Sequence, residues 1–334
     1  MIKLELIKHT HSVKDTLIFV GNGNRDFGLR VASYFPGCLS KCKISRFSDG
    51  EIEIPKIEEN VRKKNCIIIQ TVGISTQGSV NDMLLELLVL IDAIKRSSAA
   101  TITVVLPIFP YQRQDKKSYS RSPITASLIS TILENLDISR VICFDLHAGQ
   151  IQGFFNKTPL DNLFTEPYFI QYIKNMYPDN LSDLVIVSPD EGGVKRATRV
   201  AKKLNCRIAI LYKERNKPNV VDSMVLLGQV QDSTCFIIDD MIDTGGTACK
   251  AAHTLKENGA KNIYMGVCHG VLSGKAIDKI NQSAFDKVIV TNTMEITERF
   301  GKIDKIDVID ISEMCASAIY RSLTGESISE LINL

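Results

Sequence analysis

Short runs of apolar, mostly β-branched residues recur along the chain and alternate with longer segments of helical periodicity. The runs are continuous, which is typical of strands buried on both faces of a parallel sheet. They occupy residues 16–20, 66–70, 101–106, 140–145, 184–188, 207–212, 234–239, 262–267 and 286–292. This alternation predicts an α/β fold with a mainly parallel sheet.

Helical patterns lie between most of these strands. Residues 81–97 are apolar nearly all round, which predicts a deeply buried helix. Residues 124–136 and 246–259 are more amphipathic, and the second segment ends in Asn258-Gly259, a helix-stop signal.

The two halves of the 334-residue chain each contain a set of strand–helix units. A chain of this length corresponds to one very large domain or two ordinary ones. The polar segment 156–167 contains two prolines and is the best boundary. We therefore predict two similar doubly wound domains, 1–162 and 163–311. The final helix, about 312–334, is a candidate to pack on the first domain.

Composition narrows the class of protein. Hydrophobic residues make up 44% of the chain and charged residues 23%, as in a soluble globular protein, and the net charge of +2 argues against bulk nucleic-acid binding. No apolar run reaches the ~18 residues that span a bilayer. The first 15 residues carry scattered charges and no apolar core of a secretory signal. No membrane or nucleic-acid partner is expected.

The nine cysteines are odd in number, and most stand singly within apolar runs. Only Cys38 and Cys42 are close in sequence, and no second pair completes a zinc site. We expect buried, reduced thiols in a cytoplasmic protein.

Candidate chemistry centres on CFIIDDMIDTGGTACKAAHTL, residues 235–255. Asp239 and Asp240 are expected at the carboxyl end of a strand, where ligands collect in open α/β sheets. The turn Asp243-Thr244-Gly245-Gly246-Thr247 then leads into a helix, whose free N–H groups bind phosphate well. The acids would meet sugar hydroxyls or a metal ion, and ribose 5-phosphate is the simplest ligand with both features. The alternative is a helix capped by Asp243 or Thr244.

The stretch SPDEGGVKRA, residues 188–197, repeats this logic with Asp190, Gly192 and Gly193. By itself it is better explained as a capped helix. Beside the first loop, it indicates a ligand with phosphate at two positions and a carboxylate that could hold a cation.

Cationic side chains follow other strands. Residues 109–121 hold Arg113, Lys116, Lys117 and Arg121 and form either a solvated loop or a mobile lid over a polyphosphate. Lys213 and Arg215 follow another strand and could neutralise charge on a transferring phosphoryl group. Asp145 and His147 end a further strand, where the histidine could contact the nucleotide or, through water, magnesium.

Five motifs, FPYQRQDKK, DLHAGQIQGFF, SPDEGGVKRA, KER and IIDDMIDTGGT, occur in this order, and the chain resembles ribose-phosphate pyrophosphokinases (phosphoribosyl pyrophosphate synthetases) from about residue 17 to its C-terminus. The resemblance implies domains of phosphoribosyltransferase type. It also implies the Mg²⁺-dependent reaction ATP + ribose 5-phosphate → AMP + phosphoribosyl pyrophosphate.

The resemblance also implies roles for particular residues. Lys213 and Arg215 would stabilise the transition state. Asp239 and Asp240 would meet the ribose hydroxyls, and Asp243 to Thr247 the 5-phosphate. Asp190, Gly192 and Gly193 would form the pyrophosphate and metal region. The ATP site would contain Phe47, Asp49, Glu51, Arg113, Gln114, Asp115 and His147, with His147 also near the metal.

Family resemblance further implies a homo-oligomer built from dimers, a hexamer, in which FSDGE (47–51) serves a neighbouring subunit. In the class activated by inorganic phosphate and inhibited by ADP, Arg62, Arg121 and Ser327 fall at regulatory positions. Gln112 and Glu191 depart from the small residues usual in the family. Two alternatives remain open: a catalytically silent paralogue, and a phosphoribosyltransferase that consumes the product.

Overall fold

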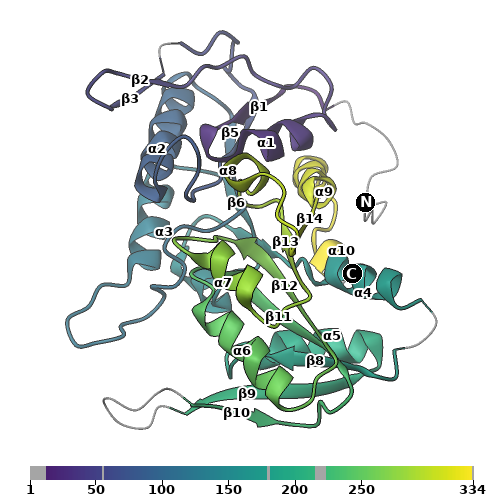
Figure 1. The fold of residues 1–334 in the computed structure, drawn as a ribbon. Helices are drawn as coiled ribbons and strands as arrows, with labels where there is room; N and C mark the ends of the chain where they lie inside the picture. The colour runs from purple at the N-terminus through teal and green to yellow at the C-terminus, as the bar shows by residue number, and fades with distance from the viewer. Residues whose placement is uncertain (1–12, 55, 179–180, 215–222, 333–334) are drawn as a thin grey trace. The chain divides into compact units, whose positions relative to one another are not determined.

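The computed structural model describes residues 13–54, 56–178, 181–214 and 223–332 (Figure 1). The predicted strands are all present, with ends that differ by a few residues. The chain divides into two compact units. In the described part of the chain, the N-terminal unit comprises residues 13–164, 293–299 and 311–332, and the C-terminal unit comprises residues 165–292 and 300–310. The segment 293–299 was predicted in the second domain.

The N-terminal unit is built on a five-stranded parallel sheet with the order β1-β4-β5-β6-β7. Its strands are β1 (Thr16–Val20), β4 (Asn65–Ile69), β5 (Thr101–Leu106), β6 (Arg140–Phe144) and β7 (Leu160–Leu163). A separate two-stranded hairpin consists of β2 (Ser45–Arg46) and β3 (Ile52–Glu53).

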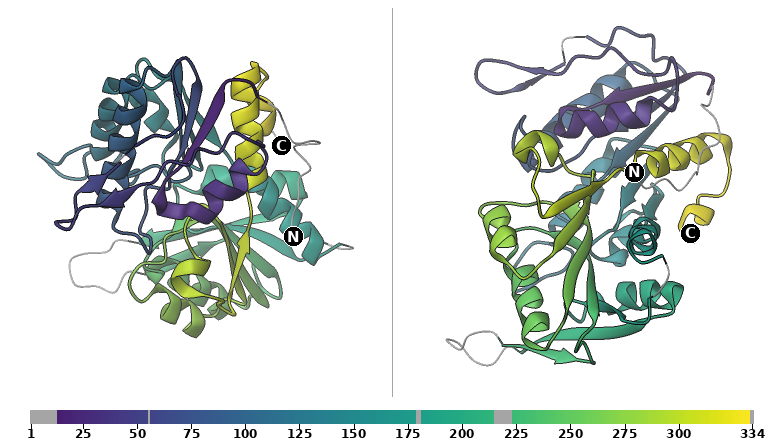
Figure 2. Two further views of the ribbon diagram at one scale, coloured as in Figure 1. Left: turned by 90° about the horizontal axis from the view of Figure 1, so that it is seen from above. Right: turned by 45° about the vertical axis from the view of Figure 1, so that its right-hand side comes forward.

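Helices cover both faces of this sheet. Side chains of α2 (Val80–Arg96) and α3 (Thr125–Asn135) share one apolar core with one face of the strands. Helix α1 (Arg25–Ala32) lies so close to β1 that a Cβ on Gly28 would come within 2.3 Å of Val20, and α9 (Ser312–Thr324) packs against α1 (Figure 2). Short helices η1 (Asn22–Asn24), η2 (Gly149–Phe154), α8 (Thr297–Phe300) and α10 (Ser329–Ile332) complete the set.

The prediction that residues 81–97 form a deeply buried helix is wrong in part. Helix α2 is present, but it buries a single stripe of side chains, and Leu85 remains 52% exposed. A helix on one face of an open sheet has one covered side, and apolar residues beyond that stripe stay at the surface.

The C-terminal unit contains a seven-stranded sheet with the order β10-β9-β8-β11-β12-β13-β14. Only β10 is antiparallel to its neighbour among the strands of this sheet. The strands are β8 (Leu184–Ser188), β9 (Arg207–Glu214), β10 (Ser223–Leu227), β11 (Thr234–Ile242), β12 (Asn262–Gly270), β13 (Lys287–Thr291) and β14 (Ile306–Ile309).

Helices lie on both faces of this sheet (Figure 2). Helices α4 (Glu166–Met176) and α5 (Val194–Leu204) cover one face, and α6 (Gly246–Glu257) and α7 (Ala276–Gln282) cover the other. The order of the strands along the chain changes direction between β8 and β11. Strand β9 is placed on one side of β8, and β11 is placed on the other side. Ligands of doubly wound sheets bind at the carboxyl ends of strands at such a switch point.

Three strands of the two large sheets were not predicted from the sequence. The segment predicted as the domain boundary, 156–167, contains the edge strand β7, and β10 and β14 are also edge strands. These three bury only part of their side chains, so their apolar signal is weak. Strand β1 is also at an edge, but it is buried along its whole length and was predicted.

Candidate active site

The adjacent acids Asp239 and Asp240 lie inside strand β11, which continues to Ile242. They lie within the last four residues of the strand, at the carboxyl end where they were expected. Both carboxylates face the Arg196 guanidinium of helix α5: Nη1 lies 2.9 Å from Oδ1 of Asp239 and 3.4 Å from Oδ1 of Asp240. The arginine is the penultimate residue of the SPDEGGVKRA stretch, yet no sequence signal assigned it a role.

The charge of Asp240 affects the ionisation of Asp239. Burial, together with the adjacent Asp240 carboxylate, raises the pKa of Asp239 well above its usual range, although Arg196 opposes this shift. Asp190 contributes in the same direction as Asp240. The switch point of the sheet thus brings two carboxylates and one guanidinium together from two segments that are distant in sequence.

The turn after β11 has the geometry of an anion-binding loop. Gly245 adopts φ +73° and immediately precedes α6, whose first N–H groups lack partners within the helix. Lys279 of α7 donates from Nζ to the carbonyl oxygen of Thr244 at 3.0 Å, and Ser273 donates to Asp243. The lysine adds positive charge beside free amides, a combination that suits phosphate. No sequence signal pointed to Lys279.

Replacing Gly245 by alanine is expected to destabilise the protein by about 1–2 kcal/mol, because a residue with a Cβ is strained in the left-handed region. The nearest atom to the added Cβ would be the Ala276 carbonyl oxygen at 3.5 Å, so the cost is backbone strain and not a clash. Gly246→Ala is the matched control, because residue 246 is the first of α6 and an added Cβ would meet nothing closer than the Thr244 hydroxyl at 3.9 Å. Thermal unfolding of both variants checks this prediction, and equal midpoints would contradict it.

The second loop is a tight turn that its own side chains stabilise through hydrogen bonds. Oδ1 of Asp190 accepts a hydrogen bond from the Gly193 N–H at 3.0 Å, and Gly193 is the N-cap of helix α5, which begins at Val194 and has no side-chain cap. Ser188 donates from Oγ to the Asp190 carbonyl oxygen at 2.7 Å. A Cβ on Gly193 would come within 2.8 Å of the Ser188 hydroxyl, so this turn requires a small residue.

Of the two predicted transition-state residues, only Lys213 lies in the described part of the chain. Lys213 lies near the carboxyl end of β9, where its backbone is paired with Met224 of β10. Arg215 lies outside the described residues. The transition-state role of both therefore stays a prediction.

In the N-terminal unit, the loops after β5 and β6 lie side by side because these strands are neighbours. His147 is exposed, and its backbone N–H donates to Oε1 of Gln112 at 2.9 Å. Asp115 is buried and accepts from Gln150 Nε2 at 2.7 Å. The Gln114 side chain accepts a hydrogen bond from Thr125 at the start of α3, and Arg113 is exposed.

Phe47, Asp49 and Glu51 lie on the tip of the β2–β3 hairpin. Phe47 is 51% exposed, and its N–H donates to the Glu51 carbonyl oxygen at 2.9 Å. Arg46 ties the hairpin to the first turn of α2 through Asp82, at 3.0 Å. Hydrogen bonds from Ser79 and Arg46 lower the pKa of Asp82 to about 2, so this carboxylate stays charged to a more acidic pH than an ordinary aspartate. The hairpin therefore presents an exposed aromatic ring on an anchored support.

The predicted regulatory residues Arg62, Arg121 and Ser327 are all exposed in the N-terminal unit. Arg121 adopts φ +65°, and the Ser327 carbonyl oxygen accepts from Arg321 at 2.6 Å. The regulatory assignment of these three residues stays a prediction.

In the part of the chain that the structure describes, no three or more His, Cys, Asp or Glu side chains are grouped to hold a metal ion. No helix of that part is long and apolar enough to cross a membrane. All nine cysteines lie in this part and are free thiols. Burial raises the pKa of Cys235 to about 12, so this thiol is unreactive near neutral pH.

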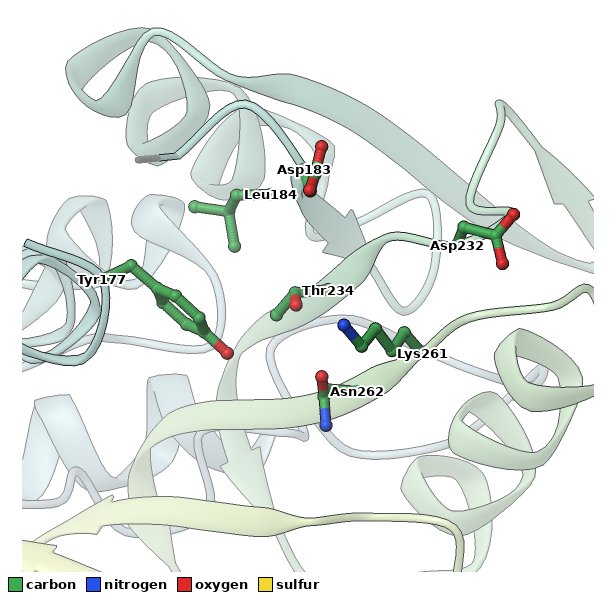
Figure 3. A pocket seen from close by; sticks show the side chains of 7 residues that line it. All are labelled: Tyr177, Asp183, Leu184, Asp232, Thr234, Lys261 and Asn262. Carbon is green, nitrogen blue, oxygen red and sulfur yellow. The ribbon is translucent and has the colours of Figure 1, made fainter. Parts of the chain in front are cut away.

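A polar pocket of about 150 Å³ lies at the amino ends of strands in the C-terminal sheet, opposite the ends that carry the predicted site (Figure 3). It is lined by Leu184, Thr234 and Asn262, the first residues of β8, β11 and β12, and by Lys261. The two acid–glycine loops, residues 188–193 and 239–247, lie at the other ends of β8 and β11. The pocket is therefore separate from the predicted site.

The fold and the two acid–glycine loops define an α/β protein of phosphoribosyltransferase type. Comparison with known proteins is more specific. Residues 16–136 match the N-terminal domain of ribose phosphate pyrophosphokinase, and residues 213–333 match the phosphoribosyl synthetase-associated domain. The chain belongs to the ribose-phosphate pyrophosphokinase family.

Relatives support this assignment over nearly the full chain. Ribose-phosphate pyrophosphokinase 2 of Schizosaccharomyces pombe is 46% identical, with 95% of this chain and 97% of the relative covered. The Bacillus subtilis enzyme is 43% identical, with 96% and 98% covered. The crystal structure of phosphoribosylpyrophosphate synthetase from Mycobacterium smegmatis matches with a TM-score of 0.86 at 35% identity, covering 93% of this chain and 100% of that one.

Proposed function

We propose that the chain transfers the β,γ-pyrophosphoryl group of ATP to the C1 hydroxyl of ribose 5-phosphate. The hydroxyl oxygen forms a bond to the β-phosphorus, the bond from that phosphorus to the α,β-bridging oxygen breaks, and AMP leaves with this oxygen. The hydroxyl proton is lost, and phosphoribosyl pyrophosphate is the second product. The observation that supports this best is the joining of both acid–glycine segments by Arg196 at the switch point.

The residues of the C-terminal unit suit ribose 5-phosphate. Gly245 to Thr247 and Lys279 offer donors to the 5-phosphate, and Asp239 and Asp240 offer acceptors to the ribose hydroxyls. Asp190, Gly192 and Gly193 are proposed to hold the pyrophosphoryl group. Catalysis then consists of positioning and charge stabilisation, the latter by Lys213 and Arg215.

Magnesium is proposed as the cofactor, and the donor chemistry fits it. Mg²⁺ prefers oxygen ligands and is usually held by one or two carboxylates together with substrate phosphates. Such a site needs no preformed group of three protein ligands, and Asp239 and Asp240, with Asp190 of the second loop, offer candidate carboxylates. When bound, the ion neutralises phosphate charge. His147 would approach it through water.

ATP is proposed to bind the N-terminal unit through Arg113, Gln114, Asp115 and His147. The exposed ring of Phe47, with Asp49 and Glu51, is proposed to reach the adenine of a neighbouring subunit, which requires a dimer-built homo-oligomer such as a hexamer. Arg62, Arg121 and Ser327 are proposed to bind the activator, inorganic phosphate, or ADP. Reduced thiols are consistent with our proposal of a cytoplasmic protein.

The purified protein is expected to form AMP and phosphoribosyl pyrophosphate in equal amounts from ATP, ribose 5-phosphate and Mg²⁺. Removal of the metal by EDTA should abolish AMP formation, and excess Mg²⁺ should restore it, because the transferring phosphates need charge neutralisation. Chromatographic quantification of both products, with and without inorganic phosphate, is the measurement.

A rise in rate with phosphate supports the regulated class, whereas an unchanged rate contradicts the proposed roles of Arg62, Arg121 and Ser327. A well-folded sample that forms no AMP under any condition would overturn the proposed activity and favour a catalytically silent paralogue.

A further inference from the structure

The loops that follow β5 and β6 are both held in unusual backbone conformations. Tyr111 has φ +55° and Asp145 has φ +38°, although neither is a glycine. Such residues cost free energy and persist where surrounding contacts hold them. Asp145 donates its N–H to the Leu163 carbonyl oxygen at 2.8 Å, and the Tyr111 hydroxyl donates to Asn81. The loops that carry Arg113 and His147 are therefore held by hydrogen bonds to Leu163 and Asn81, which lie outside both loops.

Two glutamines also join the loops to each other. Gln112 of the first loop accepts from the backbone N–H of His147 in the second, at 2.9 Å. Gln150 of the second loop donates from Nε2 to Oδ2 of Asp115 in the first, at 2.7 Å. Gln112 and Asp115 are 3% and 7% exposed, so both hydrogen bonds are anchored on buried side chains. We call this pair of contacts the glutamine clasp.

The orientation of the Gln112 amide follows from its partner. A backbone N–H needs an acceptor, so Oε1 faces His147 and Nε2 points away. This Nε2 is buried and has no hydrogen-bond partner among the described residues. A buried amide with unused donors destabilises a folded protein relative to an apolar side chain of similar length. Stability alone therefore does not account for a glutamine at this position.

We propose that Gln112 is a positioning residue for nucleotide binding: it sets the His147 loop relative to Arg113 through the His147 N–H. This inference rests on the proposed function, because it assigns both loops to the ATP site. It concerns one link of the clasp only, since Gln150 and Asp115 hold the loops together at a second point. Loss of Gln112 should therefore loosen the His147 backbone without releasing the whole loop.

The test is Gln112→Met, which preserves the side-chain length and removes both polar atoms. The His147 N–H is expected to exchange with deuterium at least ~10-fold faster, because its buried acceptor is replaced by water. The KM for ATP should rise about 3- to 10-fold, the range of one ordinary hydrogen bond, with an unchanged KM for ribose 5-phosphate. The thermal midpoint should stay the same or rise. Mass spectrometry of peptides containing His147, steady-state kinetics and calorimetry measure these quantities.

Gln152→Met is the matched control. Gln152 is exposed in the same loop, and its side chain donates to Gly149, three residues earlier, at 3.0 Å. It should change neither the exchange of His147 nor the KM for ATP. Gln112→Glu keeps an oxygen that can accept from His147 and is expected to keep slow exchange, which gives a second measurement if the methionine variant folds poorly.

Two results would overturn the inference. One is unchanged exchange of the His147 amide in Gln112→Met. The other is an unchanged KM for ATP with a lowered thermal midpoint, the signature of a purely structural side chain. Failure of the proposed function is distinguishable, because the unsubstituted protein would then form no AMP while the exchange measurement would still report on the contact.

Discussion

Replacing Lys213 by alanine is expected to lower kcat by about 10²–10³-fold, the effect of removing one group that stabilises transition-state charge. The fold should survive, because residue 213 takes part in the β9–β10 pairing through its backbone, opposite Met224. Binding of ribose 5-phosphate should be nearly unchanged, since the proposed 5-phosphate contacts lie on the turn before α6. Single-turnover AMP formation and calorimetric titration with ribose 5-phosphate are the measurements.

Controls separate this role from general surface charge. Lys203→Ala removes an exposed lysine from the last turn of α5 and should leave kcat unchanged. Lys213→Arg keeps the charge but changes its shape, and is expected to retain part of the activity. Near-normal turnover in Lys213→Ala would exclude the proposed role.

Replacing Arg196 by glutamine is expected to destabilise the protein by about 3–5 kcal/mol, as when one partner of a buried ion pair is removed. The arginine is the shared partner of Asp239 and Asp240, whose carboxylates would otherwise repel each other. At roughly 2–4 °C per kcal/mol for a unit of this size, the thermal midpoint should fall by about 10 °C. Ribose 5-phosphate binding should weaken as well. Scanning calorimetry and titration check both effects.

A double-mutant cycle tests the cause. In Arg196→Gln/Asp239→Asn, one of the two repelling charges is removed, so part of the lost stability should return, and the two effects should not add. Lys195→Gln changes the preceding, exposed residue of the same helix and should leave the midpoint within ~1–2 °C, as surface substitutions do. Strict additivity in the cycle would show that Arg196 acts independently of Asp239.

Much of the fold could be predicted because its signals are local. The central strands β5 and β8 coincide with predicted apolar runs, since strands buried on both faces need continuous apolar sequence. The edge strands β7, β10 and β14 were missed for the same reason, because they are less covered. The expected burial of α2 failed because composition does not say how many sides of a helix are covered.

The same distinction between local signals and long-range contacts applies to the residues of the candidate site. The turn Asp243 to Thr247 could be recognised because glycines between a strand and a helix indicate a backbone conformation, and Gly245 adopts it. Lys279 could not be found this way, because it reaches Thr244 from a helix 35 residues further along the chain. The Gln112–His147 contact depends likewise on β5 and β6 being neighbours.

The sequence by itself determined the strand–helix order, the two acid–glycine loops and the resemblance to pyrophosphokinases. These depend on residues close together in the chain, where side-chain period and turn chemistry act. Only the tertiary structure decided that Arg196 holds Asp239 and Asp240, and that a buried glutamine supports His147. Such partners are chosen by strand order and helix packing, which depend on the whole core and not on any short stretch.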